Sequence, residues 1–332
     1  MSLSVGIVGL PNAGKSTLFN ALAARRLAET AARPFTTIEP HEAVVPVPDE
    51  RLRRLSGLVK PQETVPATVT FIDIAGLVKG AHQGEGLGNQ FLAKIREVDA
   101  LVHVVRAFVD PGVSHTGATH EPGSAEQIIE DIENVNMELE LGGIAKRPTI
   151  YVLNIGEQNV GASESQRLTE LVEGKFGNTA IAVSAKLEEE LIDLAPDERK
   201  QYLAEVGAQE SGLIQIIKRA YELLSLVTFY TIKGGVELHA WSIKQGESAL
   251  QAAAKVHSDF AKGFIKAEVI GVEELLGFGG PASTRGEEPA SQNLGESTQG
   301  GWKAAKEHGK VRLEGRDYAV ADGDVIEFKV GG

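Results

Sequence analysis

The first two thirds of the chain alternate between short apolar runs and stretches in which apolar residues recur every three or four positions. The apolar runs, rich in β-branched residues, are 3–8, 69–72, 100–105 and 149–153. The stretches with helical spacing include 18–24, 90–98 and 126–141. Apolar strands that alternate with helices predict an α/β domain, in which helices cover both faces of a mostly parallel sheet.

The pattern changes after about residue 225. Two alternating runs, 227–232 and 236–241, are separated by a Lys-Gly-Gly turn and predict a β-hairpin. A small α+β module follows and ends in a strand-like run at 324–330. Within it, residues 277–301 are rich in Gly, Ser, Pro, Glu and Gln, a composition that predicts a mobile surface loop. We therefore expect two domains, which comprise residues 1–225 and 226–332.

The link between the first strand and the first helix carries the most specific pattern in the chain. Residues 9–16 read G-L-P-N-A-G-K-S and fit the phosphate-binding pattern G-x-x-x-x-G-K-[ST]. The glycines let successive main-chain N–H groups turn inward around phosphate oxygens, while Lys15 adds a positive charge and the Ser16 hydroxyl is placed to bind Mg²⁺. The pattern predicts a nucleoside triphosphate site whose phosphate-side contacts are Asn12, Ala13, Gly14, Lys15, Ser16 and Thr17.

Two further segments predict the groups around the metal and the γ-phosphate. Asp73 follows the apolar strand 69–72, where a carboxylate can hold Mg²⁺, and Gly76 can donate its N–H to the γ-phosphate. The proline-bounded loop 33–40 offers two hydroxyls, of which we expect Thr37 to complete the metal shell as a switch residue. A plain surface turn stays open as the alternative for this loop. The predicted metal ligands are Ser16, Thr37 and Asp73.

Segments after two later strands predict the base pocket. Asn154-Ile155-Gly156-Glu157 follows the run 149–153, and Ser184-Ala185-Lys186 follows the run 181–183. GTPases normally have Asn-Lys-x-Asp and Ser-Ala-Lys at these places. The extra methylene of Glu157 would misplace the carboxylate that accepts two guanine N–H groups, whereas the Asn154 amide can match adenine. The pattern favours ATP, or at least argues against strict GTP specificity, with base contacts from Asn154, Ile155, Ser184, Ala185 and Lys186.

The residue that follows Gly76 bears on the rate of hydrolysis. Many GTPases have a Gln there that orients the attacking water, but this chain has Leu77. Leucine has no hydrogen-bonding group in its side chain. We therefore expect slow intrinsic turnover that relies on another group, a partner or a monovalent cation.

Composition narrows the class of protein. The chain of 332 residues has no cysteine, which excludes disulfides and thiol catalysis and fits a cytoplasmic protein. No apolar run approaches about 18 residues and the N-terminus leads into a strand, so we expect no membrane span, signal peptide or membrane partner. The net charge of −13 is concentrated in residues 107–225, which carry −12. Nucleic-acid binding over the whole surface and a specific DNA partner are therefore not expected, while local basic patches remain open.

Taken together, these residues resemble the Obg-like ATPases, specifically the YchF subfamily. The matching stretches are GLPNAGKSTLFNAL, PFTTIEP, VVPVPDERL, FIDIAGLVKGAHQGEGLGNQFLAKIREVDALVHVVRAF, YVLNIGEQ and VSAKLEEEL, followed by HAWSIKQGESALQAAAKVHSDFAKGFIKAEVI and GKVRLEGRDYAVADGDVIEFKV. The resemblance implies a Ras-like P-loop NTPase domain followed by a C-terminal TGS module with a β-grasp fold. It also implies ATP hydrolysis to ADP with Mg²⁺ and binding to the ribosome or ribosomal RNA.

Two further residues match the family, and one segment departs from it. Asn12 matches a phosphate-loop Asn linked to K⁺ dependence, which makes K⁺ a second cofactor to test, and His115 matches a loop His associated with hydrolysis. A solvated bystander is the alternative for His115. The family normally inserts a long coiled coil before the strand that leads to Asn154, but residues 137–148 run almost directly into that strand. We therefore expect this coiled coil to be absent.

Two other functions remain open from the sequence. One is an Obg-type GTPase, which a preference for GTP would reveal. The other is a nucleotide-gated module that binds the ribosome or RNA with negligible hydrolysis, an alternative that Leu77 motivates.

Overall fold

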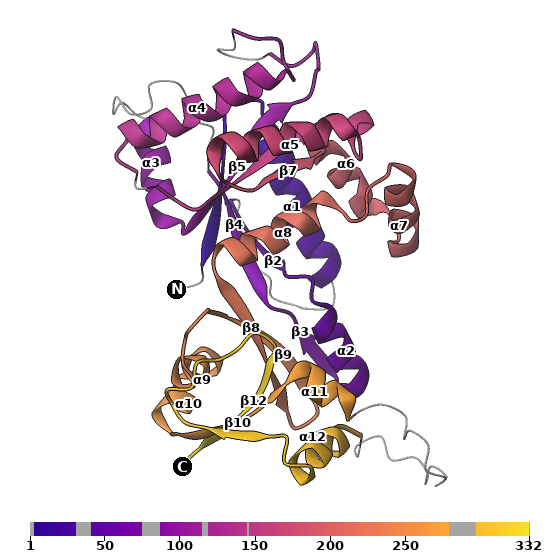
Figure 1. The fold of residues 1–332 in the computed structure, drawn as a ribbon, viewed down its shortest axis with the longest axis vertical. Helices are drawn as coiled ribbons and strands as arrows, with labels where there is room; N and C mark the ends of the chain where they lie inside the picture. The colour runs from indigo at the N-terminus through magenta and orange to yellow at the C-terminus, as the bar shows by residue number, and fades with distance from the viewer. Residues whose placement is uncertain are drawn as a thin grey trace. The chain divides into compact units, whose positions relative to one another are not determined.

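The structure, a computed structural model, describes residues 3–30, 41–74, 87–114, 119–144, 146–278 and 297–331. The chain forms two compact units (Figure 1). The first comprises Met1–Pro46 and Val69–Leu224, and the second comprises Val47–Thr68 and Ser225–Gly332.

The first unit is built on a six-stranded sheet in the order β2-β4-β1-β5-β6-β7. The strands are β1 (Ser4–Val8), β2 (Glu42–Pro46), β4 (Thr68–Asp73), β5 (Ala100–Ala107), β6 (Thr149–Ile155) and β7 (Ala180–Val183). Every neighbouring pair from β4 through β7 is parallel. All eight residues of β5 are buried, as expected for a central strand covered on both faces. The prediction of an α/β domain of the Ras-like P-loop class with a mostly parallel sheet is confirmed.

Helices complete the first unit. Their bounds are α1 (Lys15–Thr30), α3 (Leu87–Glu97), α4 (Ala125–Leu141), α5 (Ser163–Phe176), α6 (Ala185–Glu190), α7 (Pro196–Glu205) and α8 (Gly212–Leu223), with short 3-10 turns η2 (Glu157–Asn159) and η3 (Leu191–Asp193). One apolar cluster includes Phe91 and Ile95 of α3, and a second joins Ile128 and Ile132 of α4 to Val172 of α5. Because these side chains pack on the strands, the strand ends and their loops are held at one edge of the sheet.

The segment between α4 and β6 is short. Leu141 ends α4 and Thr149 begins β6, so only residues 142–148 connect them. Two long helices cannot be formed by a connection of this length, since each helical residue advances only about 1.5 Å. The expected absence of a coiled coil at this place agrees with the structure.

The second unit contains a six-stranded sheet in the order β11-β10-β12-β8-β9-β3. Its elements are α2 (Glu50–Val59), β3 (Glu63–Val65), β8 (Leu226–Lys233), β9 (Glu237–Lys244), α9 (Ala249–Val256), α10 (Ser258–Lys262), β10 (Phe264–Gly271), α11 (Val272–Gly277), α12 (Ser297–Glu307), β11 (Arg312–Glu314) and β12 (Asp324–Val330). The predicted hairpin is present as β8 and β9, which pair antiparallel. The last strand, β12, inserts between β10 and β8 and pairs with β8 in parallel, which is the β-grasp arrangement.

Two boundaries differ from the expectations drawn from the sequence. Residues 47–68 were assigned to the first domain, but they pack in the second unit, where β3 pairs in parallel with β9. Leu52 and Leu55 of α2 are buried in the core cluster of that unit, so the tertiary burial of one helical face decides the placement. The expected loop 277–301 also ends earlier, because α12 begins at Ser297 and carries the buried Ala305 into the same cluster. Residues 279–296 lie outside the described residues.

A polar cluster ties α2 to the second sheet. Asp49 caps α2 by accepting from the Arg51 main-chain N–H at 2.9 Å, and it also accepts from the Tyr230 hydroxyl. Arg51 in turn donates to Asp322 at 2.6 Å, and Asp322 accepts from the Thr228 N–H at 2.8 Å. Burial, with the nearby Asp49 carboxylate, raises the pKa of Tyr230, so this phenol remains a donor.

Replacing Tyr230 with Phe should destabilise the second unit. Tyr230→Phe removes the donor to Asp49, and an unsatisfied buried group costs about 1–3 kcal/mol of unfolding free energy. Both tryptophans of the chain, Trp241 and Trp302, belong to this unit, so urea unfolding followed by tryptophan fluorescence reports on it selectively. Tyr202→Phe, at an exposed position of the first unit, serves as the control. A midpoint for Tyr230→Phe equal to that of the control would contradict the role of this hydrogen bond.

Candidate functional site

The predicted phosphate loop turns from β1 into α1 through three residues with positive φ. Gly9, Asn12 and Gly14 have φ values of 148°, 62° and 96°. A Cβ atom at Gly9 would lie 2.2 Å from the Val104 carbonyl oxygen, and one at Gly14 would lie 2.1 Å from the Asn154 side-chain nitrogen. Glycine is therefore required at both positions for conformation and for space. The loop closes against β5 and β6, and α1 begins at Lys15.

Lys15 is held within the loop itself. Its ammonium donates to the Leu10 carbonyl oxygen at 2.8 Å, and the residue is 8% exposed. Burial lowers the pKa of Lys15, while the Asp73 carboxylate opposes this shift. The Lys15 ammonium and the Asp73 carboxylate are therefore close enough to interact, as a phosphate and metal site requires.

The structure describes two of the three predicted metal ligands, Ser16 and Asp73. Asp73 ends β4 in register with Ile7 of β1, and Ser16 is exposed in the first turn of α1. A carboxylate and a hydroxyl beside a phosphate loop are the oxygen donors that Mg²⁺ prefers. In the described ranges no group of three or more His, Asp and Glu side chains could hold a metal, so phosphate oxygens and water would have to supply most of the ligands. Four residues that the sequence analysis singled out lie outside the described part of the chain: Thr37, Gly76, Leu77 and His115.

Asn154 connects the phosphate loop to the second base segment. Its amide donates to the Ala13 carbonyl oxygen at 2.9 Å, and its carbonyl accepts from the Ala185 N–H at 3.0 Å. The side chain is nearly buried, and Ser184 caps α6 beside it by accepting from the Leu187 N–H. One amide hydrogen and one lone pair of Asn154 remain available for a base edge.

The other base residues are placed differently. The Ile155 side chain, predicted to contact the base, is 3% exposed and packs in the core cluster with Leu153 and Val172. Only its main chain can therefore face a nucleotide. Lys186 is exposed, and its ammonium lies 2.7 Å from a Glu157 carboxylate oxygen. The hydrogen bond and charge of Glu157 raise the pKa of Lys186, so the pair links the two base segments.

Sequence reasoning missed two groups near the loop. Arg106 directly follows the apolar run 100–105 and is 1% exposed. A charged residue directly after such a run was the available signal. The second group is the Ser114 carbonyl oxygen, which accepts from the Asn12 amide at 3.1 Å.

His103, in the same strand as Arg106, is buried, and this burial together with the Lys15 charge lowers its pKa to about 3. His103 is therefore neutral and does not supply a proton near neutral pH.

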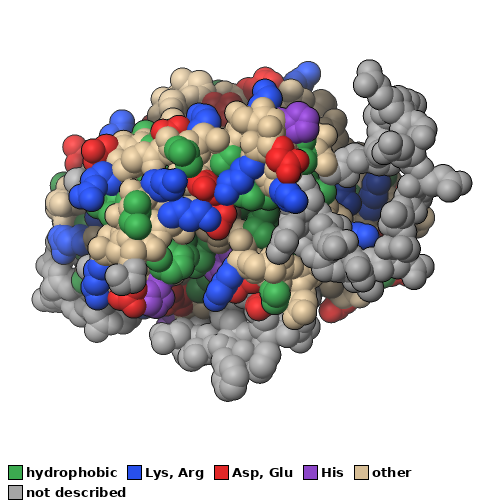
Figure 2. Space-filling view, turned by 90° about the horizontal axis from the view of Figure 1, so that it is seen from below, with side chains coloured by type: hydrophobic (Ala, Val, Ile, Leu, Met, Phe, Trp, Pro, Cys, Tyr) green, Lys and Arg blue, Asp and Glu red, His purple; other side chains and the backbone are tan. Residues whose placement is uncertain are grey.

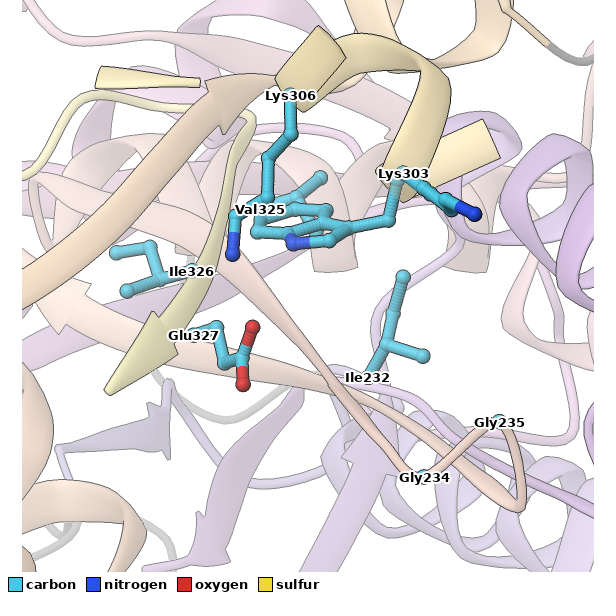
Figure 3. A pocket seen from close by; sticks show the side chains of 9 residues that line it. Ile232, Gly234, Gly235, Lys303, Lys306, Val325, Ile326 and Glu327 are labelled. Carbon is cyan, nitrogen blue, oxygen red and sulfur yellow. The ribbon is translucent and has the colours of Figure 1, made fainter. Parts of the chain in front are cut away.

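The second unit contains a cavity of about 350 Å³ (Figure 3). It is lined by side chains of α12, Trp302, Lys303 and Lys306, and by Ile232 of β8 and Glu327 of β12. The indole N–H of Trp302 is buried and makes no hydrogen bond in the described part of the chain. The sequence-predicted nucleotide residues do not line this cavity, so it is separate from the candidate nucleotide site.

Family models match both units. Residues 4–163 match a model described as 50S ribosome-binding GTPase. Residues 226–297 and 291–331 match the model YchF-GTPase_C, which is described as a protein of unknown function. The first model contains the phosphate loop and Asp73, and the second spans the β-grasp strands of the second unit.

Individual relatives match almost the whole chain. The "Ribosome-binding ATPase YchF" of Bacillus subtilis (strain 168) is 39% identical, and that of Escherichia coli O157:H7 is 37% identical, each over 99% of both chains. The solved structure titled "Structure of the Schizosaccharomyces pombe YchF GTPase" matches with a TM-score of 0.77 and 29% identity, over 99% of this chain and 98% of that chain.

The alignments are longer than this chain. The alignment to the Bacillus relative extends over 392 positions although this chain has 332 residues, so the relative has about sixty residues without a counterpart here. In the described residues, no helix is long and apolar enough to cross a membrane.

The relatives match the chain over its full length at up to 39% identity, and family models match both its P-loop domain and its C-terminal domain. The chain therefore belongs to the YchF family.

Proposed function

We propose that this protein is a nucleotide-dependent switch that binds ATP with Mg²⁺, hydrolyses it slowly to ADP and phosphate, and acts on the ribosome. The observation that carries the proposal is the phosphate loop, with Lys15 buried beside Asp73 and the loop tied through Asn154 to the second base segment. The names of the relatives, which are ribosome-binding ATPases, support the nucleotide and the partner.

In this proposal each part of the loop has a separate task. Main-chain N–H groups of residues 12–17 surround the phosphates at the start of α1, where the helix dipole favours negative charge. The Lys15 ammonium exchanges its bond to the Leu10 carbonyl for a phosphate oxygen. Ser16, Asp73 and Thr37 would hold Mg²⁺, which supplies positive charge for the transferred phosphoryl group. Gly76 donates its N–H to the γ-phosphate, and His115 assists hydrolysis.

Specificity and rate depend on three further residues. Glu157 is engaged by Lys186 rather than free to accept two N–H groups from guanine, which supports a preference for ATP. Leu77 cannot orient water, which supports slow turnover. Asn12 is exposed in the phosphate loop, and its side-chain nitrogen is bonded to Ser114. Its side-chain oxygen would be the K⁺ ligand.

The ribosome is proposed as the macromolecular partner. Figure 2 shows one face on which Lys and Arg side chains are frequent, with acidic and hydrophobic side chains among them. Such a mixed surface can contact the phosphates of ribosomal RNA locally without binding nucleic acid in general. Because ribosomes are its proposed site of action, the cytoplasm is the proposed location.

GTP is the second candidate nucleotide, and a specific observation favours it. The solved relative from Schizosaccharomyces pombe is titled a GTPase, whereas the curated relatives are named ATPases. The third candidate, a nucleotide-gated module with negligible hydrolysis, rests on Leu77 alone. Single-turnover hydrolysis of ATP and GTP with Mg²⁺, with and without K⁺ and ribosomes, separates all three; no phosphate release above background in any condition would refute the enzymatic proposal.

Removing the Lys15 ammonium should weaken ATP binding. We expect Lys15→Ala to bind ATP about tenfold or more weakly, because a hydrogen bond to a charged group contributes roughly 1.5–3 kcal/mol. Isothermal titration calorimetry measures the affinity, and circular dichroism checks the fold. Lys200→Ala, at an exposed lysine of the same unit, should leave the affinity unchanged. Equal ATP affinities for the two variants would refute the role of Lys15.

Shortening the Glu157 side chain should shift the nucleotide preference toward GTP. Glu157→Asp moves the carboxylate back by one methylene, to the length that guanine recognition normally uses. Calorimetry with ATP, ADP, GTP and GDP should show the ratio of GTP to ATP affinity rising about tenfold, within the range expected for a recovered polar contact. Glu190→Asp is the matched control, since Glu190 is a second carboxylate within 4 Å of Lys186, at 3.9 Å. The assignment of Glu157 fails if both variants keep the preference of the unmodified protein.

Ribosome association should weaken steeply with salt. Co-sedimentation with ribosomes in the presence of a non-hydrolysable ATP analogue, across about 50–200 mM salt, measures this dependence, because each phosphate contact adds to the slope of log affinity against log salt. The same series with ADP should show weaker association if the protein is a switch. Absence of association at low salt with every nucleotide would refute the ribosome as partner.

A further inference from the structure

Arg106 is a buried cation without an acidic partner in the described part of the chain. It lies near the end of β5, is 1% exposed, and is among the largest fully buried side chains. Taking a guanidinium out of water costs several kcal/mol unless its N–H groups are hydrogen-bonded. The arrangement of its partners therefore indicates what this residue stabilises.

The partners are main-chain carbonyl oxygens of the loop that follows β5. The Nε atom donates to Phe108 at 3.2 Å, one terminal nitrogen donates to Asp110 at 3.2 Å, and the other donates to Val113 at 3.0 Å and to Ser114 at 3.4 Å. The guanidinium also lies 4.7 Å from the centre of the Phe108 ring. One rigid, planar fork thus gathers four carbonyl groups and fixes the path of residues 108–114.

The base of this loop is fixed from the other side by α4. The buried Gln127 donates to the Arg106 carbonyl oxygen at 3.1 Å and to Asp131, and it accepts from the Gly123 N–H at 2.7 Å. The main chain of Arg106 therefore cannot shift without breaking this network. Its guanidinium is held in place by packing and by hydrogen bonds at both ends.

The loop ends against the phosphate loop. Ser114 accepts from the Asn12 amide nitrogen through its carbonyl oxygen at 3.1 Å and its hydroxyl at 3.4 Å. Asn12 is the non-glycine residue of the phosphate loop with positive φ, a conformation that other contacts must stabilise. The neighbouring Ala13 accepts from the Asn154 amide through its carbonyl oxygen. The phosphate loop is thus bonded to two residues outside it, Asn154 and Ser114.

We propose that Arg106 is a positioning residue for the phosphate loop, which acts through residues 108–114 and Asn12. Residues 108–114, held by Arg106, hold the Asn12 side chain and with it the left-handed turn of the main chain at Asn12. Without these contacts, a bound nucleotide would meet a turn that is not held in the geometry that hydrolysis requires. The inference rests on the proposed nucleotide hydrolysis for its kinetic part only.

The test compares Arg106→Lys with a matched control. Arg106→Lys keeps the positive charge but loses the fork that reaches four carbonyl groups. Arg199 offers the control, because it also donates to three main-chain carbonyls, those of residues 191, 192 and 194 at 2.9–3.3 Å. We expect Arg106→Lys to lower kcat for ATP about tenfold, with KM changed less than about threefold, since small displacements of positioning groups have effects of this size. Arg199→Lys should leave kcat unchanged.

A second pair of measurements separates positioning from general stability. In the double variant Arg106→Lys/Asn12→Ala, kcat should equal that of Asn12→Ala alone, because Arg106 then has no route to the phosphate loop. Hydrogen–deuterium exchange without nucleotide and without K⁺ should show faster exchange at residues 10–16 for Arg106→Lys and for Asn12→Ala. Arg199→Lys should accelerate exchange at residues 191–194 only.

Wild-type kcat and wild-type exchange in folded Arg106→Lys would overturn the proposal, and so would additive effects in the double variant. If Arg106→Lys does not fold, Asn12→Ala tests the same link from its exposed end, and unchanged exchange at residues 10–16 would overturn the inference. If the unmodified protein hydrolyses no nucleotide, the proposed function fails, while the exchange comparison still decides whether Arg106 holds the phosphate loop.

Discussion

The first unit depends on one side chain that satisfies main-chain groups from two separate loops. Asn154, at the end of β6, donates to the carbonyl of Ala13 and accepts from the N–H of Ala185. This bridge brings the phosphate loop so close to β6 that only glycine fits at position 14. A loop rich in main-chain polar groups can be buried at the sheet edge only because such partners are present. The candidate site is thus assembled by hydrogen bonds to the main chain more than by contacts between side chains.

Two buried ionisable groups of this unit, Arg106 and Glu188, are also bonded to the main chain. Arg106 is satisfied by four carbonyl oxygens, and Glu188 accepts from the Ser211 hydroxyl and the Gly212 N–H, both at 2.5 Å. Burial raises the pKa of Glu188, and its hydrogen bonds oppose that shift. Each group orders the main chain at a loop or a helix start, Arg106 after β5 and Glu188 at the N-terminus of α8. A charge that is solvated by the main chain in this way constrains conformation, whereas a surface ion pair contributes little.

The route of the chain through the two units adds a second constraint. Residues 47–68 leave the first sheet after β2 and return to it at β4, and between these strands they contribute α2 and β3 to the second unit. A chain of hydrogen bonds fixes the start of α2 there, from Tyr230 to Asp49, from Arg51 to Asp49 and from Arg51 to Asp322. The second unit is consequently not a simple C-terminal extension, since part of its core comes from the segment that precedes Asp73.

The amino-acid sequence by itself determined the α/β class, the phosphate loop, the place of Asp73 after a buried strand, and the β-hairpin that opens the C-terminal domain. These features are local: strand and helix periods, a glycine pattern and the order of elements suffice to predict them. The tertiary structure decided that 47–68 belongs to the second unit, that the Ile155 side chain packs in the core, and that Arg106 and Asn12 both donate to the Ser114 carbonyl oxygen. Each of these depends on a partner distant in sequence, as in the bond between Asn12 and Ser114. Neither burial nor the path of a loop can be derived from residue spacing alone, because both depend on which surfaces meet when the chain folds.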